Sequence, residues 1–208
     1  MTWSEIAVVV VAALLLLVWL VWLAANRLDR LHRKVASSRQ ALDHQLVRRA
    51  SAAAELGAAG VLDPASSVLV MDAAWEALAV GGNGDGELVR TAERSPGDPR
   101  ERLPGDRERE AAESDLSLTL RTALADPEEV RSLEADGLAH ELLEALAASW
   151  YRVQLARRFH NEAVAQTQRV RRKVVVRVLR LHGRAAMPRT VEIDDGWPDG
   201  LARPGHVG

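Results

Sequence analysis

The longest apolar stretch of the chain lies near the amino terminus, from Ile6 to Ala25. It contains twenty consecutive residues without a charge, a glycine or a proline. A helix of this length is about 30 Å long, which matches the hydrocarbon core of a bilayer. Trp19 and Trp22 lie towards its second end, and aromatic side chains favour the membrane interface. The pattern predicts a membrane-spanning helix over residues 6–25, preceded by a short extracytoplasmic terminus of residues 1–5.

The polar and apolar positions after residue 26 follow a helical period. Seven apolar residues recur at spacings of three, four and seven: Leu28, Leu31, Val35, Leu42, Leu46, Ala50 and Ala53. We therefore expect the spanning helix to continue to about residue 60. Asp63 and Pro64 have the form of an N-cap and a first-turn proline, so a second helix is expected over residues 65–80. Its buried face would carry Val68, Met71, Trp75 and Leu78.

Two more helices follow from the same pattern. A third is expected over residues 107–125, and a last one from Pro127 to about Leu181, capped by Asp126 and interrupted at Gly137. The last helix carries a heptad series of mostly small positions: Leu142, Leu146, Ser149, Val153, Ala156, His160, Ala163, Thr167, Val170 and Val174. Small residues at these positions favour close packing between helices.

Two stretches rich in glycine and proline lack this periodicity. Residues 81–107 are expected to form a flexible loop, and residues 183–208 an irregular tail. The alternation over residues 190–193 is too short for a sheet. The predicted fold class is therefore all-α, with a single transmembrane helix that continues into an antiparallel four-helix bundle over residues 26–182. In this topology the fourth helix returns towards the membrane.

Positive charge is distributed unevenly on the two sides of the apolar run. Glu5 is the only charged side chain before it, whereas Arg27, Arg30 and further bases follow it. Because basic residues stay on the cytoplasmic side, we expect a single-pass protein of the cell membrane with its amino terminus outside and its bundle in the cytoplasm. A cleaved signal peptide is the alternative, but the basic start is missing, and Trp22 and Leu23 stand where small residues are required.

Charge is also segregated along the last helix. Residues 126–144 carry seven acids and one base, whereas residues 152–184 carry ten bases and one acid. Five of these bases are interleaved with apolar residues at helical spacing: Arg171, Arg172, Lys173, Arg177 and Arg180. Such a basic amphipathic end is a candidate contact for anionic lipid. The alternatives are a solvated face, pairing with the acidic region, and contact with nucleic acid or another acidic partner.

Composition excludes several activities. The chain has no cysteine, which excludes disulfides, thiol catalysis and Cys-ligated metal centres. A net charge of −2 excludes a wholly basic nucleic-acid binder, so no nucleic-acid partner is expected. His140 begins half of a zinc-binding helix, but Glu144 stands where the second histidine is needed. We expect no catalytic residues, no metal, no cofactor and no small-molecule substrate.

Three segments carry a shared pattern. The first, residues 42–49 (LDHQLVRR), contains Asp43, Gln45, Leu46 and Arg49. The second, residues 156–164 (ARRFHNEAV), contains Ala156, Arg157, Asn161 and Val164. These resemble the I/L-D-x-Q-L-x-R-R and A-R-x-x-Y-N-x-x-V motifs of the LemA family, with His160 at the tyrosine position, and residues 112–117 (AESDLS) resemble its A-E-x-x-L-S segment. The resemblance covers roughly residues 5–195 and implies an N-terminally anchored helical bundle with no established enzymatic activity.

The functional expectation follows from the anchor, the bundle pattern and the resemblance. We expect a non-enzymatic scaffold or adapter at the cytoplasmic face, with membrane lipid and an unknown protein, or a second copy, as partners. A self-assembling structural membrane protein and an enzyme with an unrecognised site are the alternatives. Within the bundle, His160 lies on the apolar seam and needs a hydrogen-bond partner, for which Asp43, Gln45 or Arg49 are candidates.

Overall fold

The computed structural model describes residues 3–93, 104–178 and 186–205, and within them it contains helices and no strand. The helices are α1 (Trp3–Ala58), α2 (Pro64–Glu93), α3 (Pro104–Ala123), α4 (Pro127–Glu134), α5 (Gly137–Arg171) and α6 (Val174–Val178). The prediction of an all-α chain with one long N-terminal helix is therefore confirmed. The apolar run and the first bundle helix form a single unbroken helix of 56 residues.

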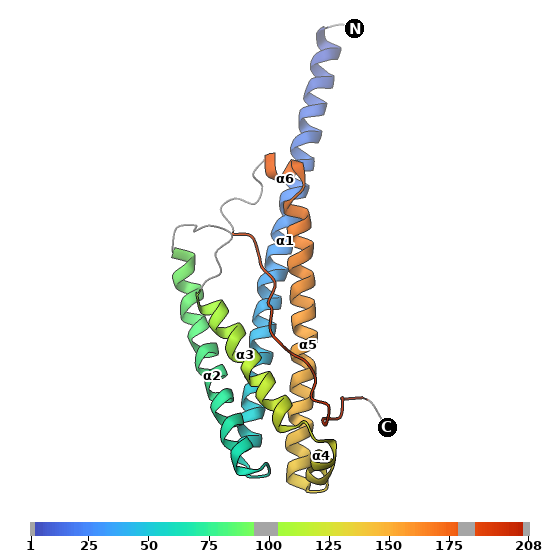
Figure 1. The fold of residues 1–208 in the computed structure, drawn as a ribbon. Coiled ribbons are helices and arrows are strands. Elements are labelled where there is room, and N and C mark those ends of the chain that lie inside the picture. Colours follow the sequence, from blue (N-terminus) through green and yellow to red (C-terminus); the bar gives the residue numbers. More distant parts are fainter. Residues whose placement is uncertain (1–2, 94–103, 179–185, 206–208) are drawn as a thin grey trace.

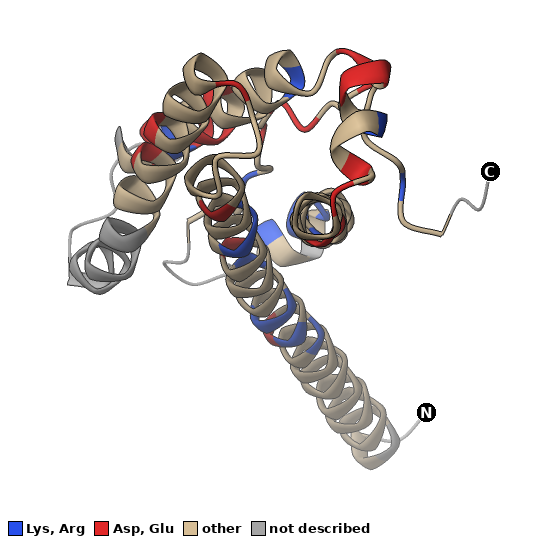
Figure 2. Ribbon diagram, turned by 90° about the horizontal axis from the view of Figure 1, so that it is seen from below, with Lys and Arg blue, Asp and Glu red and all other residues tan. Residues whose placement is uncertain are grey.

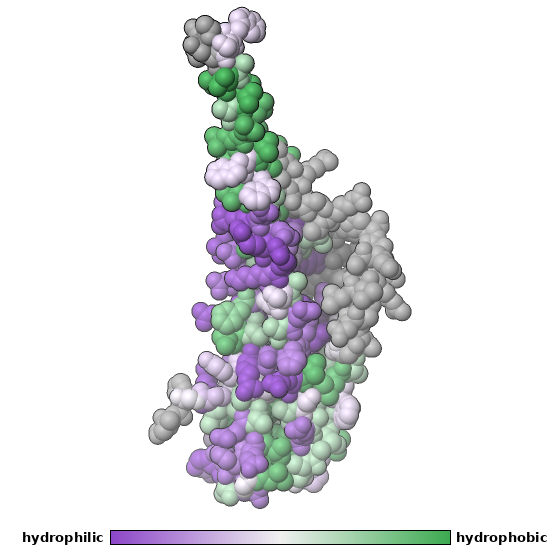
Figure 3. Space-filling view, turned by 180° about the vertical axis from the view of Figure 1, so that it is seen from behind, coloured by the Kyte–Doolittle hydropathy of each residue, from purple (hydrophilic) through white to green (hydrophobic). Residues whose placement is uncertain are grey.

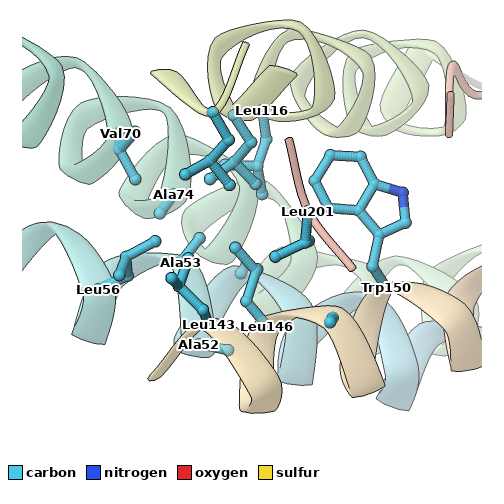
Figure 4. Close-up of a cluster of buried hydrophobic side chains, with 14 of the residues drawn as sticks. Ala52, Ala53, Leu56, Val70, Ala74, Leu116, Leu143, Leu146, Trp150 and Leu201 are labelled. Carbon is cyan, nitrogen blue, oxygen red and sulfur yellow. The ribbon is translucent and has the colours of Figure 1, made fainter. Parts of the chain in front are cut away.

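The long helices alternate in direction, and α1 lies between two partners (Figure 1). It packs against α5 on one side and α2 on the other, while α3 packs mainly on α2. The four long helices α1, α2, α3 and α5 all contribute to one apolar cluster, which lies at the end of the bundle far from the amino terminus (Figure 4). The largest side chain in this cluster is Trp150 of α5, which is fully buried beside Leu146 and Leu201.

Helix starts are fixed by aspartate caps, as the sequence predicts for two of them. Asp63 accepts hydrogen bonds from the Ala65 and Ser66 amides at the start of α2. Asp126 caps α4 in the same way, through the Glu128 amide. The interruption expected at Gly137 is also present, because Asp136 caps a new helix there. Each cap satisfies backbone donors that have no partner inside the helix.

The predicted buried face of α2 is wrong for two of its four residues, whereas the other two, Met71 and Leu78, are half-buried. Val68 and Trp75 are 61% and 65% exposed, whereas the buried positions are Val70, Ala74 and Ala77. The reason is the close crossing of α1 and α2, where a side-chain carbon at Gly57 would lie 2.7 Å from Met71 Cγ. Small residues let two helix backbones approach in this way. Val70, Ala74 and Ala77 therefore fill the buried face, and Val68 and Trp75 face outwards.

The predicted loop at residues 81–107 is also wrong over most of its length. Helix α2 continues to Glu93 and α3 begins at Pro104, while residues 94–103 lie outside the described part of the chain. Glycine lowers helix propensity by only about 1 kcal/mol per residue. The glycines of residues 81–86 therefore weaken a helix that its neighbours already define, without ending it.

The last predicted helix is divided into three. It breaks at Ala135–Asp136, as expected near Gly137, and again at Arg172–Lys173, where the prediction of a continuous helix is wrong. Residues 174–178 are helical again, and residues 179–181 of the predicted helix lie outside the described part of the chain. Three consecutive valines begin after the second break, and β-branched residues are weaker helix formers. The short α6 that they form lies beside α1 (Figure 1).

The tail is irregular, as predicted, but it is not free. Residues 186–205 run as an extended segment between α3 and α5 (Figure 1). Val191 and Ile193 are buried with Leu42 and Leu46 of α1, and Leu201 is buried in the main core. The tail thus occupies the place where α3 and α5 would otherwise meet.

Candidate functional site

The first motif of the sequence surrounds a buried arginine. Arg49 of α1 is completely buried and donates from Nη1 to Ser117 Oγ at 2.8 Å. Its Nη2 donates to the Glu113 carboxylate and to the Glu113 backbone carbonyl, each at 2.9 Å. The guanidinium also lies 5.1 Å from the ring centroid of Trp150, a favourable cation–π distance. This network ties α1, α3 and α5 together at their common core.

Glu113 is the acidic member of this network and is only 1% exposed. Burial raises the pKa of its carboxyl above the ordinary value, while the charge of Arg49 opposes the shift. A raised pKa is typical of catalytic acids, but this carboxyl is enclosed by packed helices and bonded to Arg49. The arrangement favours a structural role in fixing how α1 and α3 meet.

Asp43 lies two turns before Arg49 and joins a second charged group. Its Oδ1 is 3.2 Å from Arg39 Nε and 3.3 Å from Arg109 Nη1 of α3. Arg39 in turn contacts Asp106 at 3.0 Å, so this group links α1 to the start of α3. Gln45 is half-buried, and its Oε1 has no hydrogen-bond partner among the described residues.

The second motif holds the tail. Arg157 binds the Asp195 carboxylate through two hydrogen bonds of 2.8 and 2.7 Å. Asn161 donates to the Val191 carbonyl at 3.0 Å and accepts from the Val191 amide at 2.9 Å. This pair of bonds copies one rung of a β-ladder, so a single amide side chain fixes an extended backbone against α5.

Further contacts anchor the tail to both neighbouring helices. Trp150 Nε1 and Gln154 Nε2 of α5 donate to the Asp195 carbonyl at 3.2 and 2.7 Å. On the α3 side, the Asp194 carboxylate contacts Arg121, and its amide donates to Ser114 Oγ at 3.0 Å. The tail therefore acts as a strap between two helices that barely contact each other.

The contact between the two motifs is mainly apolar. Leu46 and Ala156 pack in one cluster with Val153, Val191 and Ile193, and Val164 is buried further along α5. The charged residues of the motifs point elsewhere: those of α1 contact α3, and those of α5 contact the tail. The expected face-to-face polar network between the motifs is therefore replaced by two separate networks.

His160 is buried at the α1–α5 contact, but its partner differs from the three candidates. Its Nδ1 is 3.0 Å from Ser38 Oγ, and it also hydrogen-bonds the Arg189 backbone. Burial lowers the pKa of the imidazole below its ordinary value, and the nearby charge of Arg39 acts in the same direction. His160 is therefore neutral in the fold around pH 7.

A separate group of bases surrounds the end of the apolar run. Leu28 and Leu31 of α1 form a small buried cluster with Val170 of α5 and Val176 of α6. Around this cluster eight exposed bases come together: Arg27, Arg30, Arg33, Lys34, Arg169, Arg172, Lys173 and Arg177. We call these eight residues the basic collar. Its α1 part is the blue region between the bundle and the N-terminal segment in Figure 2.

The collar is almost free of acids. Asp29 lies within it and is paired with Arg33 at 2.6 Å. Arg171, expected as a lipid contact, is instead 6% exposed and donates to the Ala186 carbonyl. Arg180 lies outside the described residues. Trp19 and Trp22 are exposed just above the collar, and Figure 3 shows the hydrophobic segment directly adjoining a strongly hydrophilic band.

No grouping of potential metal ligands is present among the described residues. His140 and Glu144 form an exposed pair, with 3.7 Å between Nε2 and Oε1. The polar residues that do gather in the described part of the chain join helices or hold the tail. What the described part of the chain offers to other molecules is its surface: the apolar segment and the basic collar.

Sequence reasoning missed the tail residues that hold the molecule together. Asp195, Val191 and Ile193 lie in a stretch whose glycines and prolines predict an irregular segment. The alternation of Val191 and Ile193 with Trp197 nearby was the available signal, but four residues do not distinguish a packed strap from a free tail.

Comparisons with known proteins add no assignment. A scan against protein-family models, a search of curated proteins and a search of solved structures each found no match.

Proposed function

We propose that this protein is a non-enzymatic, membrane-anchored helical bundle that acts as a scaffold or adapter at the cytoplasmic face of the membrane. The observation that carries the proposal is the exposure of the apolar segment. Residues 6–20 are exposed along their whole length and project from the bundle with no element covering them (Figures 1 and 3). So large an apolar surface needs an apolar environment, and one helix of this chain is long and apolar enough to cross a membrane.

The continuity of α1 favours a retained anchor over a cleaved leader. The helix passes the end of the apolar run without a break, and Leu28 and Leu31 are already packed against α5 and α6 one turn later. Cleavage near residue 25 would have to occur inside this helix. The bases of the collar follow the run on one side only, which supports the orientation with the amino terminus outside.

The resemblance to the LemA family is consistent with this proposal. Its motif residues have structural roles here: Arg49 and Asp43 join α1 to α3, while Arg157 and Asn161 hold the tail. The polar residues of the motifs are therefore engaged in contacts within the chain. This supports assigning the protein a scaffold role instead of catalysis.

The topology can be tested because the chain has no cysteine. Ser4→Cys and Ser132→Cys place single thiols before the apolar run and on α4, both at exposed positions. In intact cells we expect an impermeant maleimide to label the first variant, and the second only after permeabilisation. The protein should also remain in the membrane pellet after carbonate extraction. Release by carbonate, or labelling in the reverse order, would refute the anchor as proposed.

Self-assembly is the second candidate, and the structure changes which surface could support it. Most of the heptad positions of α5 are buried within the chain, largely against α1. A different ridge on α5 is exposed, formed by Tyr151, Leu155 and Phe159 at spacings of four. Crosslinking in intact cells separates the candidates: crosslinks to one reproducible protein favour the adapter, and crosslinks only between copies favour assembly through this ridge.

A further inference from the structure

The short helix α6 has an unusual distribution of apolar side chains. Val176 is 3% exposed and packs on Leu28 and Leu31, whereas Val174 and Val178 are 72% and 73% exposed. Val174 and Val178 are one helical turn apart, and the exposed Arg177 lies next to Val178. Lys173 directly precedes the helix. In a globular domain such a turn would leave apolar surface in water for no evident gain.

The position of α6 along α1 determines the depth of these valines relative to the membrane. Val176 is buried in one cluster with Leu28 and Leu31, which lie three and six residues beyond the end of the apolar run. Three and six residues of helix rise about 4.5 and 9 Å, and the polar headgroup layer of a bilayer is roughly 5–8 Å thick on each side. If residues 6–25 span the membrane, α6 therefore lies at the depth of the headgroups.

The charges around α6 match one kind of surface. Among the described residues 27–34 and 169–178, which carry the eight bases of the collar, the one acid is Asp29, and it is already paired with Arg33. Anionic lipid headgroups attract bases at this depth, and apolar residues beside them enter the boundary with the acyl chains. Phosphatidylcholine supplies the same apolar boundary without the net negative charge, so lipid charge is the feature that the collar selects.

We propose that α6 and the basic collar form an anionic-lipid docking site, in which Val174 and Val178 insert at the headgroup–acyl boundary while Arg172, Lys173 and Arg177 bind lipid phosphates. This inference rests on the proposed anchor. It adds a second attachment point, on a different helix, so that the bundle stands at a fixed angle to the membrane. A bundle attached only through α1 would be free to rotate about that helix.

The experiment uses the full-length protein reconstituted into vesicles. Val178→Cys carries an environment-sensitive fluorophore, with Val68→Cys as an exposed site on α2 and Leu15→Cys as a site within the span. The vesicles contain either phosphatidylcholine alone or phosphatidylcholine with phosphatidylglycerol. Quenching by lipids that carry a quencher near the headgroup measures contact with the bilayer.

We expect lipid quenching at residue 178 in the vesicles that contain phosphatidylglycerol, and much less in phosphatidylcholine alone or at high salt. Each base near an anionic surface changes the docking equilibrium by about fivefold, so Arg172→Glu, Lys173→Glu and Arg177→Glu together should abolish the quenching. Arg48→Glu, Arg152→Glu and Arg158→Glu reverse three exposed bases elsewhere on α1 and α5 and should leave it unchanged.

The labels also separate the two proposals. Quenching at residue 15 together with a residue 178 label as accessible to water as that at residue 68 would overturn the docking site and leave the anchor in place. Absence of quenching at residue 15 would overturn the anchor and, with it, this inference. Equal quenching at residue 178 in both lipid mixtures would reject the selection for anionic lipid.

Discussion

Arg49 shows how one charged residue can organise a helical core. It brings a full charge into the apolar centre, and that charge is tolerated because Glu113, Ser117 and the Trp150 ring surround it. Removing one partner of such a pair leaves an uncompensated buried charge, which typically costs several kcal/mol. The network is therefore the place where a single substitution should do the most damage.

We expect Glu113→Gln to lower the free energy of unfolding by about 3 kcal/mol, because Arg49 would lose its buried counter-charge. Urea unfolding followed by circular dichroism measures this loss. Glu108→Gln is the matched control, since Glu108 is exposed on the same helix and should change stability by less than about 0.5 kcal/mol. The pair Arg49→Met with Glu113→Leu should recover most of the stability. Equal stability of the Glu113→Gln and Glu108→Gln variants would contradict a structural role for the Arg49–Glu113 pair.

His160 predicts a dependence of stability on pH. Its pKa is lowered in the fold, so the unfolded chain binds a proton at a higher pH than the native protein does. Stability should therefore be independent of this group well above pH 6.5 and should fall as the pH drops below that ordinary value. Ser38 and Arg39 of α1 and the Arg189 backbone face the imidazole. The charge of Arg39 lowers the pKa together with burial, whereas the Arg189 hydrogen bond and the charge of Asp43 raise it.

We expect His160→Leu to leave stability at pH 7.5 within about 1 kcal/mol of the unsubstituted protein, since Ser38 keeps a hydrogen bond to the Val35 carbonyl. The loss of stability on acidification should become smaller in this variant. Thermal unfolding across pH 5–8 tests both statements. A collapse of the unfolding temperature by many degrees at pH 7.5 would mean that the histidine network is indispensable.

The extended tail is the element that completes the bundle. Its close approach to other elements depends on glycine at residue 200, where a side-chain carbon would lie 2.6 Å from the Leu124 carbonyl and 2.9 Å from Val130 Cγ2. Neither neighbour can move easily, because one is backbone and the other is a buried side chain. At this point the strap can approach Leu124 and Val130 so closely only because residue 200 carries no side chain.

We expect Gly200→Ala to lower the free energy of unfolding by about 2 kcal/mol, because the added carbon overpacks this contact. Gly137→Ala is the control, since a side-chain carbon at Gly137 meets nothing within 4 Å. That control should be neutral or slightly stabilising within a helix. Hydrogen exchange of the Val191 amide, bonded to Asn161, would report whether the whole strap loosens. Equal protection in both variants would argue against a strap that depends on Gly200.

The whole molecule divides into an apolar rod and a packed bundle. Residues 6–20 are exposed throughout and contribute nothing to the three apolar clusters. Leu28 and Leu31 are the first residues of α1 that are buried in one of these clusters. The boundary between rod and bundle therefore falls just after the apolar run.

We expect residues 27–208 to fold without the rod into a soluble, cooperatively unfolding helical protein. The reason is that all three apolar clusters lie within this part of the chain. Circular dichroism and size-exclusion chromatography measure the outcome, and a variant starting at residue 33, which lacks Leu28 and Leu31, should unfold at a lower temperature. A molten or aggregated product from residues 27–208 would mean that the rod takes part in folding.

The sequence by itself determined those features that depend on near neighbours. The apolar run, the helical seam of α1 and the aspartate caps at Asp63 and Asp126 are local patterns, because a helix satisfies its backbone and spaces its side chains within a few residues. The extent of α1 and the all-α class could therefore be predicted. The bases at the end of the run could be located in the same way.

Tertiary structure decided which surfaces meet. The buried face of α2 depends on small residues that allow a close crossing with α1. The hydrophobic pattern therefore predicted that Trp75 is buried, whereas the packing buries Ala74 and leaves Trp75 exposed. The partners of Arg49 and Arg157 lie 64 and 38 residues away, and no local rule connects them. The tail became an element only because α3 and α5 leave a place between them, where its backbone groups find partners that an isolated extended segment lacks.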